Sequence, residues 1–273
     1  MTNSFRITKS FRAHFLCLLG CCAFTLRAAT IPTSWDFGTG SGQDDLTDFS
    51  QFGTWTLESD SARISLASTD FATFGNVTSF SDLGGGNPQD FQANLTFTIT
   101  QDNSADFSRY SMIVLADGST ELNLNGTGIT AEFLKNANTE DYEIALRTGL
   151  NSSRISGASA AFPGRSFDDD LSGAVISMQL NGTYSNGSLS LDLQVWDDSN
   201  NAQSLSNISV DAADYSGNYF GMGARMGSTG TTPENSLIID YGNFAVIPEP
   251  GTLMLMGIAF ASLLAFRRRA RAR

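Results

Sequence analysis

Between residues 30 and 247 the chain has no cysteine, no histidine and a single lysine, Lys135. The three cysteines and the one histidine all lie within the first 22 residues. Zinc sites built on Cys and His, and Cys–His or Ser–His–Asp nucleophile systems, therefore have no residues to use in this region, and a Schiff-base lysine would have to be Lys135. A cysteine-free region of this length is held together by its hydrophobic core and not by disulfides.

Basic residues are also scarce in this region. Of the 16 Lys and Arg residues, four precede residue 30 and five follow residue 266, which leaves seven in the middle against 27 of the 28 acidic residues. The middle therefore carries a formal net charge of −20, whereas the whole chain carries −12. Such a charge repels phosphate backbones and anionic lipid, so we expect no nucleic acid among the partners.

The first 29 residues have the pattern of a secretory signal peptide. Three basic residues precede an apolar stretch over 13–26, and Ala28 and Ala29 supply small residues for cleavage. A lipoprotein signal is the alternative, because Leu-Leu-Gly-Cys at 18–21 resembles a lipobox, in which case Cys21 would be acylated. Both interpretations predict that the protein is exported.

The C-terminus combines three elements in a fixed order. The motif Pro248, Glu249 and Pro250 comes first, an uncharged apolar run over 251–266 follows, and the tail contains five arginines, namely Arg267, Arg268, Arg269, Arg271 and Arg273. A helix over this run would cover roughly 24 Å, a little less than the hydrocarbon core of a bilayer. The arginines would hold the end of the chain in the cytoplasm. A plain membrane anchor is one interpretation of this segment.

The same three elements resemble the PEP-CTERM sorting signal of exported bacterial proteins. The resemblance implies that an exosortase recognises residues 248–273, cuts near Pro-Glu-Pro and releases the protein from the inner membrane to the cell surface or extracellular matrix. Gly251 departs from the Ser, Thr or Ala that is commoner at its position. We therefore expect a signal peptide (1–29), a middle domain (30–247) and a sorting signal (248–273) with a transmembrane helix over 251–266.

Alternation of apolar and polar residues with a period of two dominates the middle domain. The segments 176–184 and 189–195 alternate on either side of Asn186-Gly187, which predicts a β-hairpin because both turn residues tolerate positive φ. Further strands are predicted over 54–57, 63–67, 91–100, 111–116, 129–134, 142–147, 205–210, 219–226 and 237–246. With no convincing helical period, this pattern predicts an all-β fold, a single antiparallel β-sandwich. In the hairpin Leu191 should point inward and Asp192 outward, so Asp192→Ala should be nearly neutral for stability.

The last two predicted strands resemble the closing strands of concanavalin-like and laminin-G-like jelly rolls. In those folds a strand containing Phe-Gly precedes a final strand that ends in Asp-Asn-Phe or similar. Here NYFGMGARMG at 218–227 precedes SLIIDYGNFAV at 236–246, which has an insertion within Asp240–Phe244. The resemblance implies a jelly roll and carries no particular activity with it.

Without His or Cys, an enzyme built on this domain would use paired carboxylates. Asp141 and Glu143 would point to the same face of a strand, roughly 6.6 Å apart, which is close to the separations used in glycoside hydrolysis. Jelly-roll glycosidases usually place a third acid in step with such a pair, and the corresponding positions here are Thr139 and Ala145. Solvated charge at a strand edge is the alternative interpretation.

Aromatic and acidic side chains on predicted loops and strand ends could bind a ligand or a metal. Flat aromatic rings suit the C–H faces of sugars, although packing is the alternative for each of Trp196, Tyr215 and Tyr219. Calcium is the metal that the acidic loops would suit best, although none has the full Asp-x-Asp-x-Asp-Gly pattern. The oxygen ligands would come from Asp168, Asp169, Asp170, Asp197 and Asp198.

The sequence thus predicts an exported, exosortase-sorted and non-catalytic component of the cell surface or extracellular matrix that binds polysaccharide. Its expected partners are the exosortase, the inner membrane before processing, and extracellular polysaccharide. No cofactor is expected other than calcium. The alternative is a carboxylate-based polysaccharide hydrolase on the same jelly-roll fold.

Overall fold

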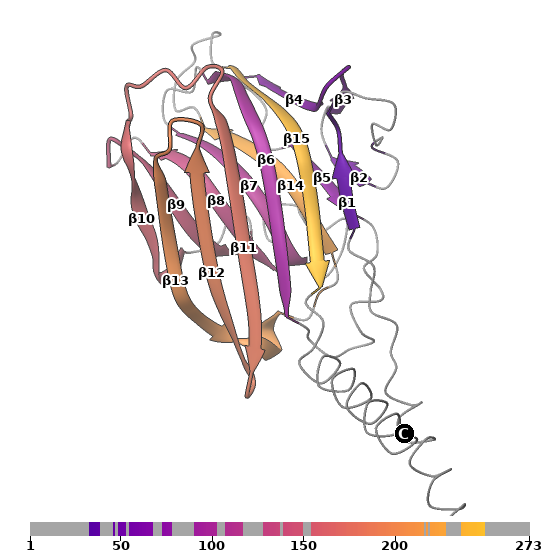
Figure 1. The fold of residues 1–273 in the computed structure, drawn as a ribbon, viewed down its shortest axis with the longest axis vertical. Coiled ribbons are helices and arrows are strands. Elements are labelled where there is room, and N and C mark those ends of the chain that lie inside the picture. The colour runs from indigo at the N-terminus through magenta and orange to yellow at the C-terminus, as the bar shows by residue number, and fades with distance from the viewer. Residues whose placement is uncertain are drawn as a thin grey trace, which may run out of the picture. The chain divides into compact units, whose positions relative to one another are not determined.

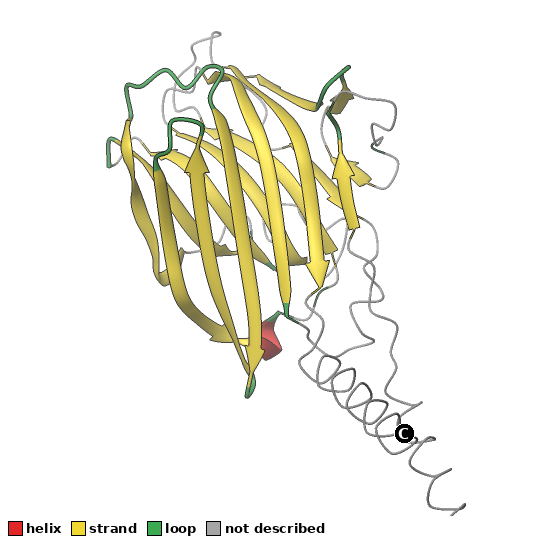
Figure 2. Cartoon of the chain, viewed as in Figure 1, coloured by secondary structure: helices red, strands yellow, loops and turns green. Residues whose placement is uncertain are grey.

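The computed structural model describes residues 33–38, 46, 49–52, 55–67, 73–77, 90–102, 107–116, 128–136, 139–149, 154–215, 217, 219–227 and 236–248. These residues form two antiparallel sheets packed face to face (Figure 1). The only helix in the described ranges is one short 3-10 turn, η1 (Ala212–Asp214), as Figure 2 shows. The predicted all-β sandwich is therefore confirmed. The predicted signal peptide, Cys21 and the helix over 251–266 lie outside the described residues.

The first sheet, which we call sheet A, has the order β13-β12-β11-β6-β15-β4-β3, and β1 also pairs with β15. Its strands are β1 (Thr33–Asp36), β3 (Trp55–Leu57), β4 (Ala62–Ala67), β6 (Phe91–Asp102), β11 (Val175–Ser185), β12 (Ser188–Asp197), β13 (Ala202–Asp211) and β15 (Ser236–Pro248). The second sheet, sheet B, has the order β10-β9-β8-β7-β14-β5-β2. Its strands are β2 (Phe49–Phe52), β5 (Thr73–Val77), β7 (Phe107–Ala116), β8 (Ile129–Asn136), β9 (Asp141–Thr148), β10 (Arg154–Ser166) and β14 (Tyr219–Gly227).

The hairpin of β11 and β12 forms where the alternation predicted it. The two strands pair from Ser185↔Ser188 at the turn to Ile176↔Asp197 at the open end. Asn186 and Gly187 have φ of 52° and 81°, which matches the right-handed twist of the flanking strands. Every other strand predicted from alternation is also present.

Strands β1, β2, β5 and β10 were not predicted. The longest of these, β10, lies at the edge of sheet B and pairs only with β9. It contains Pro163 together with Gly157 and Gly164, whose φ angles are 74° and 72°. Its register with β9 shifts twice along its length. An edge strand tolerates these residues because one side makes no ladder hydrogen bonds, but they hide the alternation.

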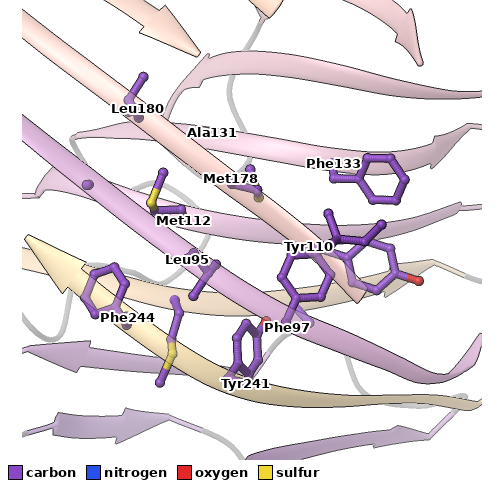
Figure 3. Close-up of a cluster of buried hydrophobic side chains, with 14 of the residues drawn as sticks. Leu95, Phe97, Tyr110, Met112, Ala131, Phe133, Met178, Leu180, Tyr241 and Phe244 are labelled. Atoms are coloured by element: carbon purple, nitrogen blue, oxygen red, sulfur yellow. The ribbon is translucent and has the colours of Figure 1, made fainter. Parts of the chain in front are cut away.

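The core lies between the two sheets and is rich in aromatic rings (Figure 3). Phe97 of sheet A stacks on Tyr110 of sheet B with ring centroids 5.3 Å apart. The Tyr241 hydroxyl of β15 donates to the carbonyl oxygen of Gly223 in β14 at 2.7 Å, which hydrogen-bonds one sheet to the other. Burial raises the pKa of both Tyr110 and Tyr241 well above the usual value. Burial of these large rings supplies much of the stability of the sandwich.

Strand β15 lies inside sheet A and has partners on both sides. It pairs with β6 from Leu237↔Asp102 to Pro248↔Phe91. Its other side pairs first with β4 and then with β1, where Thr33 lies opposite Val246. No helix within the described ranges is long and apolar enough to cross a membrane.

Candidate ligand-binding face

The outward face of β11, β12 and β13 is polar and accessible. Leu189, Leu191, Leu193 and Val195 of β12 are buried, so the alternate positions Ser190, Asp192, Gln194 and Trp196 point outward. The neighbouring strands place Asn181 of β11 and Ser204 of β13 beside them, because Asn181 pairs with Asp192 and Ser204 with Gln194. Amide, hydroxyl and carboxylate groups from three strands therefore share one surface.

A shallow groove of about 420 Å³ crosses this surface. Apart from Leu193, the residues that line it have side chains able to donate or accept hydrogen bonds. The lining residues are Asn181, Asp192, Leu193, Gln194, Ser204, Ser206 and Asn207.

A β-bulge shapes one wall of the groove. The register between β12 and β13 shifts between Leu191↔Ile208 and Leu193↔Leu205. Asn207 takes a positive φ of 58° at the bulge, and its backbone N–H donates to Asp192 Oδ1 at 2.7 Å. Because a bulge bends its strand locally, it re-aims the side chains beside it. Asp192 thus holds the bend that gives the groove its form.

Trp196 lies next to the groove on the same outward face. It follows Gln194 by two residues on β12, which is roughly 6.6 Å along a strand. The residue is 37% exposed, and its cross-strand neighbours Ser177 and Ala202 are small. The face therefore combines an exposed flat ring with a row of polar groups.

The three predicted ligand-binding aromatics do not come together. Tyr215 is 7% exposed and belongs to the core, and its carbonyl oxygen accepts from the Tyr184 hydroxyl near the closed end of the β11–β12 hairpin. Trp196 lies near the open end of the same hairpin. Tyr219 is half-buried on β14 in sheet B. Only Trp196 offers an exposed ring.

Asp141 and Glu143 share the outward face of β9. Tyr142 lies between them and Ile144 follows, and both of these residues belong to the core. Glu143 forms an ion pair with Arg154, and only 8% of its side chain is exposed. A carboxyl group that protonates a glycosidic oxygen must contact the substrate. In this arrangement Glu143 instead contacts an arginine of the neighbouring strand.

The predicted calcium ligands take part in local hydrogen bonds. Asp169 Oδ2 accepts from the Ser166 amide at 2.7 Å, and Asp198 Oδ2 accepts from the Val175 amide at 3.3 Å. Hydrogen bonds from Ser172 lower the pKa of Asp170, while Asp168 is exposed. Within the part of the chain that the structure describes, no three His, Cys, Asp or Glu side chains are grouped around one metal position. The calcium site stays a prediction.

Asp197 is the most heavily engaged of these carboxylates. Its Oδ2 accepts from Arg165 Nε at 2.8 Å and from Asn201 Nδ2 at 2.9 Å, while Oδ1 accepts the amides of Ser199 and Asn201. Burial would raise the pKa of Asp197, but the hydrogen bonds from Asn201 and Arg165 outweigh it and lower the pKa. Because Arg165 belongs to β10, the contact joins the edge strand of sheet B to β12, the second strand of sheet A.

The groove residues were not singled out from the sequence. The signal for them was present in the outward positions of the predicted hairpin, which include Asp192 and Gln194. Their partners Ser204 and Ser206 could not be assigned to the same surface, because the register of β13 depends on the bulge at Asn207.

The fold matches solved structures of legume lectins. The Lotus tetragonolobus seed lectin aligns with a TM-score of 0.54 at 12% identity, over 81% of this chain and 100% of that lectin. The lectin from Bauhinia forficata in complex with GalNAc gives 0.54 at 14% identity, over 80% and 99%. The winged bean acidic lectin complexed with methyl-α-D-galactose gives 0.53 at 15% identity, over 81% and 100%. The described domain is therefore a legume-lectin-like jelly roll, which confirms the predicted concanavalin-like fold.

The C-terminal segment matches the family model of the PEP-CTERM protein-sorting motif over residues 246–269. The sorting signal predicted from Pro248, Glu249, Pro250 and the arginine-rich tail is thus confirmed. The sequence has no match among the curated proteins. Taken together, the protein is an exported, exosortase-sorted chain that carries a legume-lectin-like domain.

Proposed function

We propose that the protein is a non-catalytic component of the cell surface or extracellular matrix that binds polysaccharide through the outward face of β11–β13. The observation that carries this proposal is the groove beside Trp196. Sugars present hydroxyl groups that both donate and accept, and they also present apolar C–H faces. The groove offers amides, hydroxyls and a carboxylate, and Trp196 offers a ring for stacking.

The fold and the charge support the same proposal. Two of the matched lectins were solved with GalNAc and with methyl-α-D-galactose, which are neutral sugars bound by those proteins. The net charge of the middle domain disfavours nucleic acids and strongly acidic polymers as ligands for this face. Export by exosortase sorting delivers the domain to a place where polysaccharide is present.

A glycan array probed with the exported protein, with and without calcium, tests the proposal. We expect binding to polysaccharides built mainly of neutral sugars. Trp196→Ala should weaken that binding at least tenfold, which corresponds to about 1.4 kcal/mol. Leu57→Ala is the matched control, because Leu57 is another exposed apolar residue of sheet A, on β3. Equal losses in both variants, or no binding to any glycan, would contradict the proposal.

The hydrolase alternative is tested with the same material. The measurement is the release of reducing sugar from a polysaccharide. If sugar is released, and if the double substitution Asp141→Asn and Glu143→Gln abolishes the release, the protein is a hydrolase. We expect no such release, because Glu143 is held by Arg154 and no third acid lies in step with the pair.

Processing at both ends is part of the proposal. We expect the mature protein to begin near 29–31 and to end near Pro248 or Glu249. Intact-mass spectrometry of the exported form measures this directly. Retention of Arg267–Arg273 would leave a plain membrane anchor, and an acylated N-terminal Cys21 would establish the lipoprotein alternative.

A further inference from the structure

Sheet B gathers most of the positive charge of an otherwise acidic domain. Arg109 of β7, Arg147 of β9, Arg154 of β10 and Arg225 of β14 are four of the seven basic residues between 30 and 247. In the backbone register Arg225 of β14 lies opposite Arg109 of β7, and Arg154 of β10 lies opposite Arg147 of β9. Their neighbours Tyr110, Leu146 and Ala224 belong to the core, so the arginines lie on the outward face. We call these four residues the arginine cluster.

Two carboxylates from the described strands contact the cluster, those of Glu132 and Glu143. Glu132 Oε2 accepts from Arg147 Nε at 2.6 Å, and its Oε1 lies 3.7 Å from Arg109 Nη1. Glu143 pairs with Arg154. Within the described part of the chain, the four guanidinium groups together therefore contact two carboxylates. Asp141 shares the outward face but lies further along β9, opposite Asn136. Among the described residues, Arg225 makes neither an ion pair nor a side-chain hydrogen bond.

Buried polar atoms in the cluster lack partners. The Nε atoms of Arg109 and Arg225 and the Oε1 atom of Glu132 are buried without a hydrogen bond, although only 1% of the Glu132 side chain is exposed. Burial lowers the pKa of Arg109 and of Arg225, with Glu132 opposing the shift and neighbouring arginines adding to it. Burying unpaired donors is costly, and an oxyanion that accepts from the two Nε–H groups would relieve that cost.

The two less satisfied arginines are positioned together. The guanidinium carbon of Arg109 lies 4.9 Å from the centroid of the Phe107 ring, and that of Arg225 lies 5.5 Å from it. Contacts with the Phe107 ring hold the two planar guanidinium groups in place. A guanidinium group can donate two parallel hydrogen bonds to a carboxylate. The side chain of Arg109 is 17% exposed and that of Arg154 is 31% exposed, so a ligand in solution can reach the cluster.

We propose that the arginine cluster is an anion site that binds the carboxylate of a uronic acid, with Arg225 and Arg109 donating to the two carboxylate oxygens. A single carboxylate suits the two buried Nε–H donors of Arg109 and Arg225, whereas the net charge of the domain repels dense polyanions. This site lies on sheet B and is separate from the groove beside Trp196. It would allow the protein to bind a mainly neutral polysaccharide that also carries occasional uronic acids.

Calorimetric titration of the exported protein at low ionic strength tests the site, with three probes. We expect methyl glucuronoside to bind, and methyl glucoside to bind at least tenfold more weakly to this site. Sodium acetate, the third probe, should also bind more weakly than the uronoside. Equal affinity for the uronoside and the glucoside would overturn the proposal. Acetate binding as tightly as the uronoside would overturn its sugar component and leave a site for free carboxylates.

Variants locate the site. Arg225→Gln should weaken uronoside binding at least tenfold, and Arg225→Lys should weaken it less, because charge remains but the fork is lost. Arg63→Gln, which removes an arginine from sheet A, and Trp196→Ala should both leave uronoside binding unchanged. The Trp196 result separates this site from the groove, so either can fail alone. A folded Arg225→Gln protein that binds as well as wild type would overturn the proposal.

A measurement on the unsubstituted protein covers the case in which Arg225→Gln does not fold. The Nε–H resonances of Arg109 and Arg225 report directly on new hydrogen bonds to an oxyanion. We expect both resonances to move on addition of methyl glucuronoside, while those of Arg63 stay in place. No movement at saturating uronoside would contradict the proposed contacts.

Discussion

On sheet A the outward positions of β12, Ser190, Asp192, Gln194 and Trp196, are accessible and carry one charge. On sheet B the outward positions of β8, Thr130, Glu132 and Leu134, are as buried as the inward ones. Polar and apolar residues alternate in β12 and in the first part of β8, Ile-Thr-Ala-Glu-Phe at 129–133, so the alternation does not tell whether a polar residue faces water. Glu132 occupies a polar position because arginines from neighbouring strands contact it, whereas Gln194 occupies one because it is exposed.

The largest effect is expected on the inward face that both sheets share. Leu191→Asp places an unpaired charge in the core and should cost about 4 kcal/mol or more, a large fraction of the stability of a domain. Leu57→Asp, at an exposed position of sheet A, should be tolerated. Denaturant unfolding of the two variants measures the difference. A folded, stable Leu191→Asp protein would show that β12 is not packed against the core.

Next in size is the effect of Glu132→Ala, which removes the buried carboxylate that the half-buried Arg109 and Arg147 contact. We expect a loss of about 3–4 kcal/mol, because breaking a buried ion pair leaves uncompensated charge. Glu58→Ala is the matched control on sheet A, since Glu58 is 41% exposed and lies 3.8 Å from Arg63. That change should stay within about 0.5 kcal/mol. Similar losses of stability for Glu132→Ala and Glu58→Ala would show that the ion pairs on the two sheets do not differ in their contribution.

A pH-dependent effect is expected at the half-buried ion pair of Arg63 and Asp240 in sheet A. Arg63 Nε and Nη2 donate to Asp240 at 2.7 and 2.8 Å, and Thr100 donates at 2.6 Å. Burial would raise the pKa of Asp240, but the hydrogen bonds from Arg63 and Thr100 outweigh it and lower the pKa. A lowered folded-state pKa gives stability that is present above the unfolded pKa of about 3.9 and is lost as pH falls through the folded value.

Asp240→Asn should therefore cost about 1–2 kcal/mol at pH 7, and the difference from wild type should vanish at the acidic end of the titration. Thermal unfolding of both proteins between pH 7 and pH 2 measures this convergence. A constant difference across the range would mean that ionisation of Asp240 does not contribute.

The smallest effect is expected at Asp192, and here the structure changes the prediction made from the sequence. Alternation predicted that Asp192→Ala would be nearly neutral, but Asp192 accepts the Asn207 amide at the bulge. Losing one such hydrogen bond should cost about 1 kcal/mol. Ser190→Ala, two residues earlier on the same face, serves as the control and should cost less. Equal values would show that the bulge does not depend on the Asp192 carboxylate.

The local features of the fold could be predicted from the sequence, but features that depend on distant partners could not. The Asn186-Gly187 turn is determined by two adjacent residues, so the hairpin was predicted correctly. The arginine cluster comes from four strands whose positions span residues 109 to 225, and no local pattern relates them. The groove depends on the bulge at Asn207, which only the cross-strand register reveals. The sorting signal was predictable because its three elements are contiguous.

The position of β15 has a mechanical consequence for any load applied to the C-terminal end of the domain. The strand ends at Pro248, within the matched sorting motif, after pairing with β6 along almost its whole length. Tension applied at this end acts along the strand, so the hydrogen bonds to β6, β4 and β1 would be loaded together in shear and not broken one after another from a free edge. A load at this end would thus be shared by the hydrogen bonds to three neighbouring strands.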